Sequence, residues 1–125
     1  NINIKESIEF HKALGKKITL TAVRPEGRYG ALSIGDKDMI TEFTEKPSGD
    51  GGWVNGGFFI CEPDIFNYIK DNQTVFEQEP LEQLATSNQM AAFKHRGFWL
   101  PMDKLSDKQK LCKLWDEDKA PWKIW

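Results

Sequence analysis

The stretch 42–60, EFTEKPSGDGGWVNGGFFI, joins a strand-like alternation to an apolar run through a glycine-rich loop. Apolar and polar residues alternate up to Lys46, and Pro47 cannot donate a backbone hydrogen bond to a sheet, so the strand should stop at Lys46. Glu45 and Lys46 then lie at a strand end beside that loop, a position at which α/β sheets commonly bind ligands. An alternative is that the two charges form a solvated ion pair followed by a hairpin-like connection, since Glu-Lys-Pro is a short and common string.

The segments before this stretch alternate between helical and strand-like patterns. Apolar residues near helical spacing over 4–14, followed by Gly15 and two lysines, predict a helix that ends at the glycine. The β-branched run 18–23 predicts a strand, and a helix followed by a strand is the order found in a crossover unit. Two further strands, 29–34 and 39–45, flank a polar turn and predict a hairpin.

Four more elements are expected after the glycine-rich loop. They are a short helix beginning at Pro63, a helix over 77–85, a strand over 90–99 and a helix over 104–118. The tail 120–125 carries two tryptophans, and so apolar a segment should dock on its own domain or on a neighbouring subunit.

The composition is that of an ordinary globular domain. A chain of 125 residues is long enough to bury one core. The net charge of −2 provides no basic surface for a nucleic-acid polymer. No apolar run approaches the roughly 20 residues that a transmembrane helix needs. We therefore expect a cytoplasmic protein with no nucleic-acid or membrane partner. Cys61 and Cys112 lack the spacing of a metal site, which predicts free, partly buried thiols.

Three residues outside the central stretch are candidates by residue type alone. His11 and His95 have no obvious partner nearby in the sequence and are expected to be structural residues, exposed or half-buried. Asp103 lies at a predicted strand-to-helix junction, where a carboxylate either caps the helix or binds a hard cation such as Mg²⁺. Capping preference favours the first interpretation of Asp103. Lys46 is similarly either a phosphate contact or a solvated charge at a strand end.

Five strings of this chain, taken together, resemble one enzyme family. They are RYGAL (28–32), FTEKP (43–47), WVNGGFFI (53–60), HRGFWLPMDKLSDKQKLCKLW (95–115) and KAPWKIW (119–125). In combination they resemble the second half of a sugar-1-phosphate nucleotidylyltransferase, and the later strings are similar to the branch that uses CTP and glucose 1-phosphate. The resemblance implies part of a Rossmann-like α/β/α sandwich, with a mixed sheet, flanking helices and a C-terminal helix. It also implies that 1–125 is the C-terminal, sugar-binding part of that domain, without the N-terminal nucleotide-binding half.

The resemblance implies a Mg²⁺-dependent nucleotidyl transfer and assigns roles to three charged residues. Glu45 would hold hydroxyls of the glucose, and Lys46 would hold its phosphate. Asp103 matches one of two aspartates that bind the catalytic Mg²⁺. These residue types suit the chemistry, because the protein positions the phosphates and neutralises their charge without forming a covalent bond.

Gly30, Asn55 and Gly56 complete the implied substrate site. Gly30 would let the backbone approach the sugar, and Asn55 with Gly56 would line the same pocket. Tyr29, Trp53 and Glu79 are weaker candidates for the pocket wall.

The implied partners are glucose 1-phosphate and CTP in a homo-oligomer, with the CTP site mostly in the missing half. The chain alone is therefore expected to lack activity. Two other hypotheses remain open. One is a non-catalytic sugar-phosphate-binding or assembly module. The other is a uridylyl- or thymidylyltransferase of the same family, because the base is read in the missing half.

Overall fold

A computed structural model describes residues 1–25, 31–34, 39–44 and 52–125. The chain divides into two compact units. The first unit consists of residues 2–22 and 55–95, and the second of residue 1, residues 23–54 and residues 96–125.

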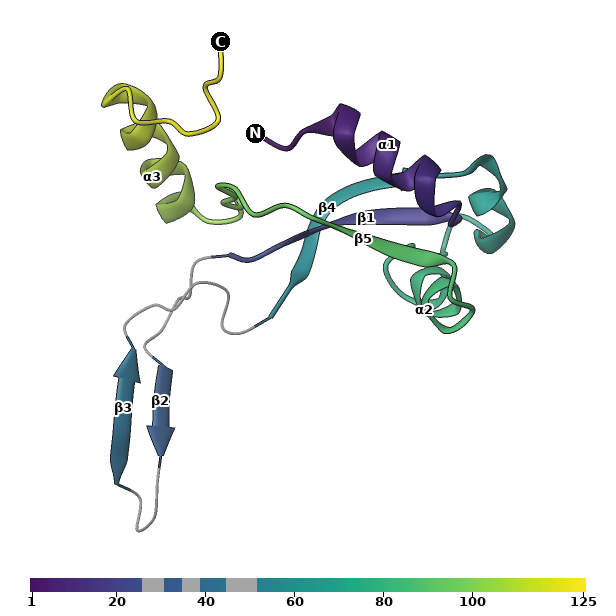
Figure 1. The fold of residues 1–125 in the computed structure, drawn as a ribbon, viewed down its shortest axis with the longest axis horizontal. Coiled ribbons are helices and arrows are strands. Elements are labelled where there is room, and N and C mark those ends of the chain that lie inside the picture. The colour runs from purple at the N-terminus through teal and green to yellow at the C-terminus, as the bar shows by residue number, and fades with distance from the viewer. Residues whose placement is uncertain (26–30, 35–38, 45–51) are drawn as a thin grey trace. The chain divides into compact units, whose positions relative to one another are not determined.

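The first unit is built on a three-stranded sheet in the order β4–β1–β5 (Figure 1). β1 (Ile18–Val23) and β5 (Met90–Lys94) are parallel neighbours. The N–H of Glu62, just after β4 (Val54–Cys61), donates to the carbonyl of Lys17, just before β1. The end of β4 therefore lies beside the start of β1, so the two strands are antiparallel. The sheet is therefore mixed and joined to helices, which confirms the predicted α/β class.

Helix α1 (Ile4–Leu14) confirms the first predicted helix and has well-defined ends. The side-chain oxygen of Asn3 accepts a hydrogen bond from the N–H of Glu6 at 3.1 Å. Gly15 ends the helix with φ 58°, a left-handed conformation that glycine adopts without a Cβ penalty. Its N–H donates to the carbonyl of His11 at 3.1 Å.

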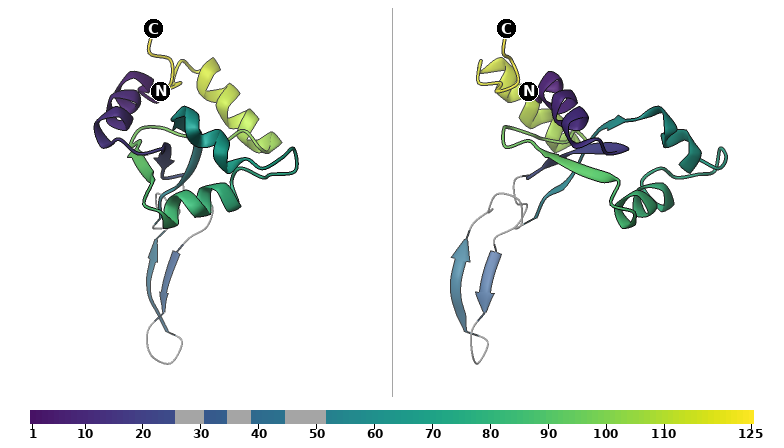
Figure 2. Two further views of the ribbon diagram at one scale, coloured as in Figure 1. Left: turned by 90° about the vertical axis from the view of Figure 1, so that its right-hand side faces the viewer. Right: turned by 45° about the vertical axis from the view of Figure 1, so that its right-hand side comes forward.

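Helices lie on both faces of this sheet (Figures 1 and 2). Successive residues of a strand point to opposite faces, and β1 uses this alternation. Thr19 points toward α1, where its hydroxyl contacts His11. The preceding residue, Ile18, packs instead with Leu84 of α2 (Glu79–Thr86). β1 is thus buried by α1 on one face of the sheet and by α2 on the other.

The apolar core of the first unit lies on the α2 side of the sheet. Ile18, Ile65 and Leu84 are its buried residues, and Ile65 comes from the 3-10 helix Pro63–Tyr68. Partly buried side chains surround them: Phe59, Tyr68, Phe76, Leu81 and Met90. The rings of Phe59 and Phe76 meet edge to face with centroids 5.6 Å apart, a favourable aromatic arrangement.

The described strands of the second unit form the predicted hairpin. β2 (Ala31–Ile34) and β3 (Ile40–Thr44) pair antiparallel, with Ala31 opposite Thr44. The pairing forms a separate two-stranded sheet.

Helix α3 (Leu105–Asp116) and the tail after it also belong to the second unit. The ring of Trp122 packs on that of Phe98, with centroids 5.5 Å apart. Ile124 and Trp125 are 75% and 82% exposed. The expectation that the tail docks is therefore confirmed for Trp122. No described residue covers the side chains of Ile124 and Trp125 to a similar extent.

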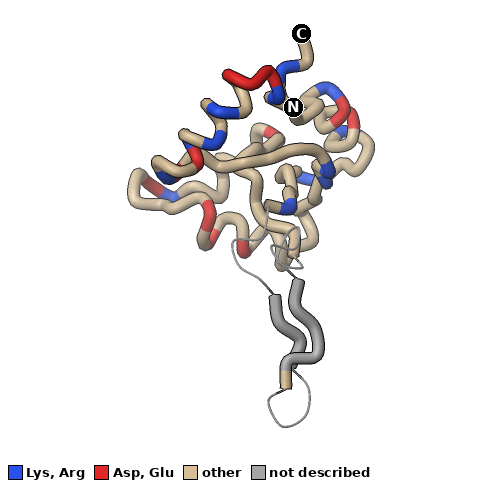
Figure 3. Tube along the Cα trace, turned by 90° about the vertical axis from the view of Figure 1, so that its left-hand side faces the viewer, with Lys and Arg blue, Asp and Glu red and all other residues tan. Residues whose placement is uncertain are grey.

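Basic and acidic residues are interspersed along α3 and the tail (Figure 3). Lys119 pairs with Glu117 at 2.9 Å, and Lys123 pairs with Asp118 at 2.8 Å. These side chains are largely solvent-exposed, and exposed pairs contribute roughly 0–1 kcal/mol each. The ion pairs therefore add little to the stability of this unit.

Two features noted from the composition, the apolar runs and the cysteines, can be described for these residues. Within the described ranges, no helix has both the length and the apolar character to cross a bilayer. Cys61 and Cys112 are free thiols, as predicted, but both are exposed rather than partly buried. Cys61 is the last residue of β4, and Cys112 lies on α3, a helix with no buried residue.

Gly57, in the middle of β4, adopts φ +82°. Gly57→Ala is expected to destabilise the chain by about 1–2 kcal/mol, because an L-residue is strained at positive φ. An added Cβ would meet no atom within 4 Å, so the cost is in the backbone alone. Gly52→Ala is the matched control, since its site is equally open and its φ lies outside that region. Urea unfolding measures both variants, and equal losses would contradict the backbone explanation.

Candidate functional site

The predicted site residues fall into two groups. Gly30, Glu45 and Lys46 lie outside the described residues, whereas Asn55, Gly56 and Asp103 lie within them. Asn55 and Gly56 belong to the first unit, and Asp103 belongs to the second. Their convergence on one cleft therefore stays a prediction.

Asn55 and Gly56 sit in β4 next to the positive-φ glycine. The side-chain oxygen of Asn55 accepts a hydrogen bond from the N–H of Gly57 at 2.9 Å. Asn55 is exposed and Gly56 is buried. Because the side-chain oxygen is used locally, the amide nitrogen of Asn55 is the group left to donate to a ligand.

Asp103 does not cap α3, so the interpretation favoured by capping preference was wrong. The helix begins one residue later than a cap at Asp103 requires, and Lys104 occupies the N-cap position. The N–H of Lys104 donates to the carboxylate of Asp107 at 3.1 Å. The backbone donor at the N-cap is thus paired with a side chain from the first turn of the same helix.

The carboxylate of Asp103 is exposed and has no hydrogen bond or ion pair to any residue that the structure describes. Within the described ranges this carboxylate is available to bind a cation. Among the described residues no group of three His, Cys, Asp or Glu side chains could hold a metal. Asp103 would contribute one ligand, and further ligands would come from elsewhere.

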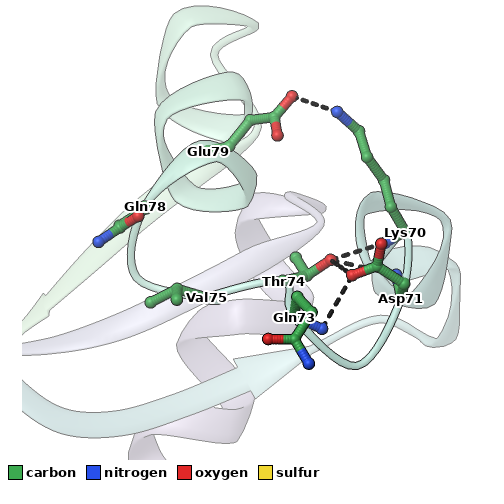
Figure 4. A pocket seen from close by; sticks show the side chains of 7 residues that line it. All are labelled: Lys70, Asp71, Gln73, Thr74, Val75, Gln78 and Glu79. Atoms are coloured by element: carbon green, nitrogen blue, oxygen red, sulfur yellow. Dashed lines mark hydrogen bonds and ion pairs between the residues drawn. The ribbon is translucent and has the colours of Figure 1, made fainter.

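A surface pocket lies between the 3-10 helix and the start of α2 (Figure 4). Its lining residues are Lys70, Asp71, Gln73, Thr74, Val75, Gln78 and Glu79. The ammonium of Lys70 pairs with the carboxylate of Glu79 at 2.5 Å across it. The carboxylate of Asp71 accepts from the N–H of Gln73 at 2.9 Å and from the hydroxyl of Thr74 at 3.3 Å. These interactions hold the loop in its shape and pair its polar groups with one another.

The three weaker candidates for a pocket wall have different outcomes. Tyr29 lies outside the described residues. Glu79 lines the pocket of Figure 4. Trp53 lies against two guanidinium groups, with Cζ of Arg24 at 4.7 Å and Cζ of Arg96 at 5.7 Å from its ring centroid. The two arginines were not anticipated, because they are 72 positions apart and only strand pairing brings them together.

A second polar cluster involves His11, which is 3% exposed rather than half-buried or exposed. Its Nδ1 lies 2.8 Å from the hydroxyl of Thr19, and its Nε2 lies 3.2 Å from the carboxylate of Glu62. A hydroxyl, an imidazole and a carboxylate in this order resemble a nucleophile with its base. Thr19 is only 1% exposed, however, so no substrate reaches its hydroxyl. The cluster ties α1 to the sheet and is structural, as the sequence predicted for His11.

Beside this cluster the ammonium of Lys17 donates a hydrogen bond to the carboxylate of Asp64. That hydrogen bond, more than the charge of the carboxylate, raises the pKa of Lys17 above its ordinary value. The other oxygen of Asp64 is buried and has no hydrogen-bond partner among the described residues. The pair joins the start of β1 to the 3-10 helix.

Comparison with known proteins gives matches along the whole chain. Residues 1–108 match the family model described as Nucleotidyl transferase. The chain is 51% identical over 125 residues to glucose-1-phosphate cytidylyltransferase of Salmonella typhi, covering all of this chain and 48% of that protein. It is 37% identical over 126 residues to a probable glucose-1-phosphate cytidylyltransferase of Bacillus subtilis, covering 49% of that protein. The chain thus spans about half the length of the curated relatives it matches.

Solved structures show the same fold at low sequence identity. HddC from Yersinia pseudotuberculosis superimposes with a TM-score of 0.60 at 22% identity, covering 91% of this chain and 50% of that one. A putative glucose-1-phosphate thymidylyltransferase from Bacillus anthracis gives a TM-score of 0.57 at 16% identity, covering 88% of this chain and 48% of that one. At these identities the similarity concerns the fold alone.

Proposed function

Because the chain belongs to the nucleotidyl transferase family, we propose that it is the C-terminal, sugar-binding part of a glucose-1-phosphate cytidylyltransferase. The observation that carries this proposal is the 51% identity over all 125 residues to the Salmonella enzyme. Similarity to the thymidylyltransferase is limited to the fold, at 16% identity, and so favours that alternative less.

The proposed reaction converts CTP and glucose 1-phosphate to CDP-glucose and pyrophosphate. A phosphate oxygen of the sugar attacks the α-phosphorus of CTP in line, and the bond to the departing pyrophosphate breaks. Glu45 would accept hydrogen bonds from the glucose hydroxyls, since one carboxylate accepts two at once. Lys46 would neutralise the attacking phosphate and so reduce its repulsion from CTP. Gly30, Asn55 and Gly56 would shape the wall of the sugar pocket.

Members of this family use a divalent metal ion, and we propose that here it is Mg²⁺. The carboxylate of Asp103 fits this ion, because Mg²⁺ prefers one or two carboxylates together with substrate phosphates. Its freedom from other described contacts supports the assignment. When bound, the ion supplies positive charge to the nucleotide phosphates.

Two further properties belong to the proposal. A cytoplasmic location suits a reaction whose substrates are cytoplasmic metabolites. A homo-oligomer suits the large apolar exposure of Ile124 and Trp125, which a second subunit would cover.

The test is pyrophosphate release from CTP, glucose 1-phosphate and Mg²⁺. We expect background rates from the 125 residues alone, because the proposed CTP site lies mostly outside them. Joining them to the N-terminal half of the Salmonella relative should give turnover with CTP above that with UTP or dTTP. Turnover by the 125 residues alone would contradict the proposal that they are one part of the site, and a joined protein that binds sugar phosphate without turnover would favour a non-catalytic module.

A further inference from the structure

Two arginines occupy equivalent positions at the carboxyl ends of two neighbouring parallel strands. In the register of β1 and β5, Ala22 lies opposite Lys94, and the N–H of His95 donates to the carbonyl of Ala22 at 2.9 Å. Two residues beyond this pair, just past the end of each strand, the chain reaches Arg24 and Arg96. The carboxyl ends of parallel strands are where α/β sheets bind ligands.

Trp53 holds both guanidinium groups against one ring. Cζ of Arg24 lies 4.7 Å from the ring centroid, and Cζ of Arg96 lies 5.7 Å from it. Guanidinium groups at these distances are attracted to the indole and lose part of their rotational freedom. The arrangement therefore holds two cations beside one indole ring before any ligand binds.

The two positive charges are not balanced by a described carboxylate. Both arginines are exposed, and neither makes an ion pair with any residue in the described ranges. Two like charges that contact one ring repel each other, and this repulsion destabilises the folded chain. An anion that contacts both guanidinium groups would lower that repulsion and use donors whose motion the indole already restricts.

We propose that Arg24, Trp53 and Arg96 form a binding site for a phosphate group. Guanidinium is the cation suited to this ligand, because its planar fork of donors matches two phosphate oxygens at once. The phosphate belongs to a monoester, such as a sugar phosphate, or to a diphosphate, such as pyrophosphate or the end of a nucleotide. The site itself stands on the geometry, and only the choice of these compounds rests on the proposed function.

The test is isothermal titration calorimetry of the chain with glucose 1-phosphate, pyrophosphate and inorganic phosphate, at constant ionic strength. Arg24→Gln combined with Arg96→Gln should lower the affinity for the anion that binds the wild type most tightly by at least tenfold. The control is Lys108→Gln on α3, which removes one positive charge, as each single arginine variant does, and should leave that affinity unchanged. The indole N–H signal of Trp53, identified by Trp53→Phe, should shift in the NMR spectrum when the anion binds to the wild type. Each single arginine variant replaces the double variant if that one does not fold.

The outcomes separate the sources of the phosphate. Tighter binding of glucose 1-phosphate supports a monoester site, and tighter binding of pyrophosphate supports a diphosphate site. Equal anion affinity in the wild type and the arginine variants would contradict the proposed site. So would a titration with millimolar anion that gives neither heat of binding nor a shift of the Trp53 indole N–H signal. Because no turnover is measured, phosphate binding that depends on the arginines would stand even if the proposed reaction failed.

Discussion

Asp103→Asn, in the chain joined to the N-terminal half of the relative, is expected to lower turnover by about 100-fold or more. The substitution keeps the shape of the side chain and removes the negative charge that would bind Mg²⁺. A metal ion contributes several kcal/mol of charge stabilisation, and each 1.36 kcal/mol is a factor of ten in rate. We expect the loss to be accompanied by a higher Mg²⁺ concentration for half-maximal rate, measured as pyrophosphate release in a Mg²⁺ titration.

Asp107→Asn is the control for this experiment. Asp107 lies four residues away, in the first turn of α3, where its carboxylate accepts a hydrogen bond from the N–H of Lys104. An asparagine there keeps an acceptor oxygen, so the Mg²⁺ dependence should not change. If Asp103→Asn matched the wild type at every Mg²⁺ concentration, Asp103 would not be a metal ligand.

Local signals predicted most helices and strands because each depends on neighbouring residues. Gly15 ends α1 through its left-handed backbone, as the sequence indicated, and the helix expected over 77–85 is present as α2. The strand expected over 90–99 was too long, since β5 ends at Lys94. Its only described neighbour, β1, ends at Val23, and a strand needs a partner to extend its ladder.

The site was less predictable because its contacts join distant positions. His11 reaches Glu62 across 51 residues, so nothing near the histidine indicated that it would be buried. Arg24 and Arg96 meet at Trp53 through strand order and register, which single-sequence patterns do not fix. Capping preference gave the wrong interpretation of Asp103, and its role as a metal ligand, which the resemblance to a family implied, stays a prediction. Glu45 and Lys46 keep the roles that this resemblance implied, as predictions.

Leu84→Ala is expected to destabilise the chain by about 2–5 kcal/mol, the range for truncating a buried leucine. Leu84 is 0% exposed and packs with Ile18 and Ile65, which are 0% and 6% exposed. Those three residues join α2, β1 and the 3-10 helix, so a cavity at Leu84 loosens three elements at once. Because a whole domain is stable by only about 5–15 kcal/mol, this single change should remove a large fraction of the total.

Two matched variants isolate the packing contribution in urea unfolding. Leu105→Ala makes the same chemical change at the start of α3, where the side chain is 69% exposed, and should shift stability by less than about 0.5 kcal/mol. Leu84→Met nearly conserves volume and should cost less than about 1.5 kcal/mol. Equal losses from Leu84→Ala and Leu105→Ala would mean that the cluster around Leu84 does not hold the first unit together. If the 125 residues alone unfold without a cooperative transition, the same three variants can be compared in the joined protein, since Leu84, Ile18 and Ile65 all belong to this chain.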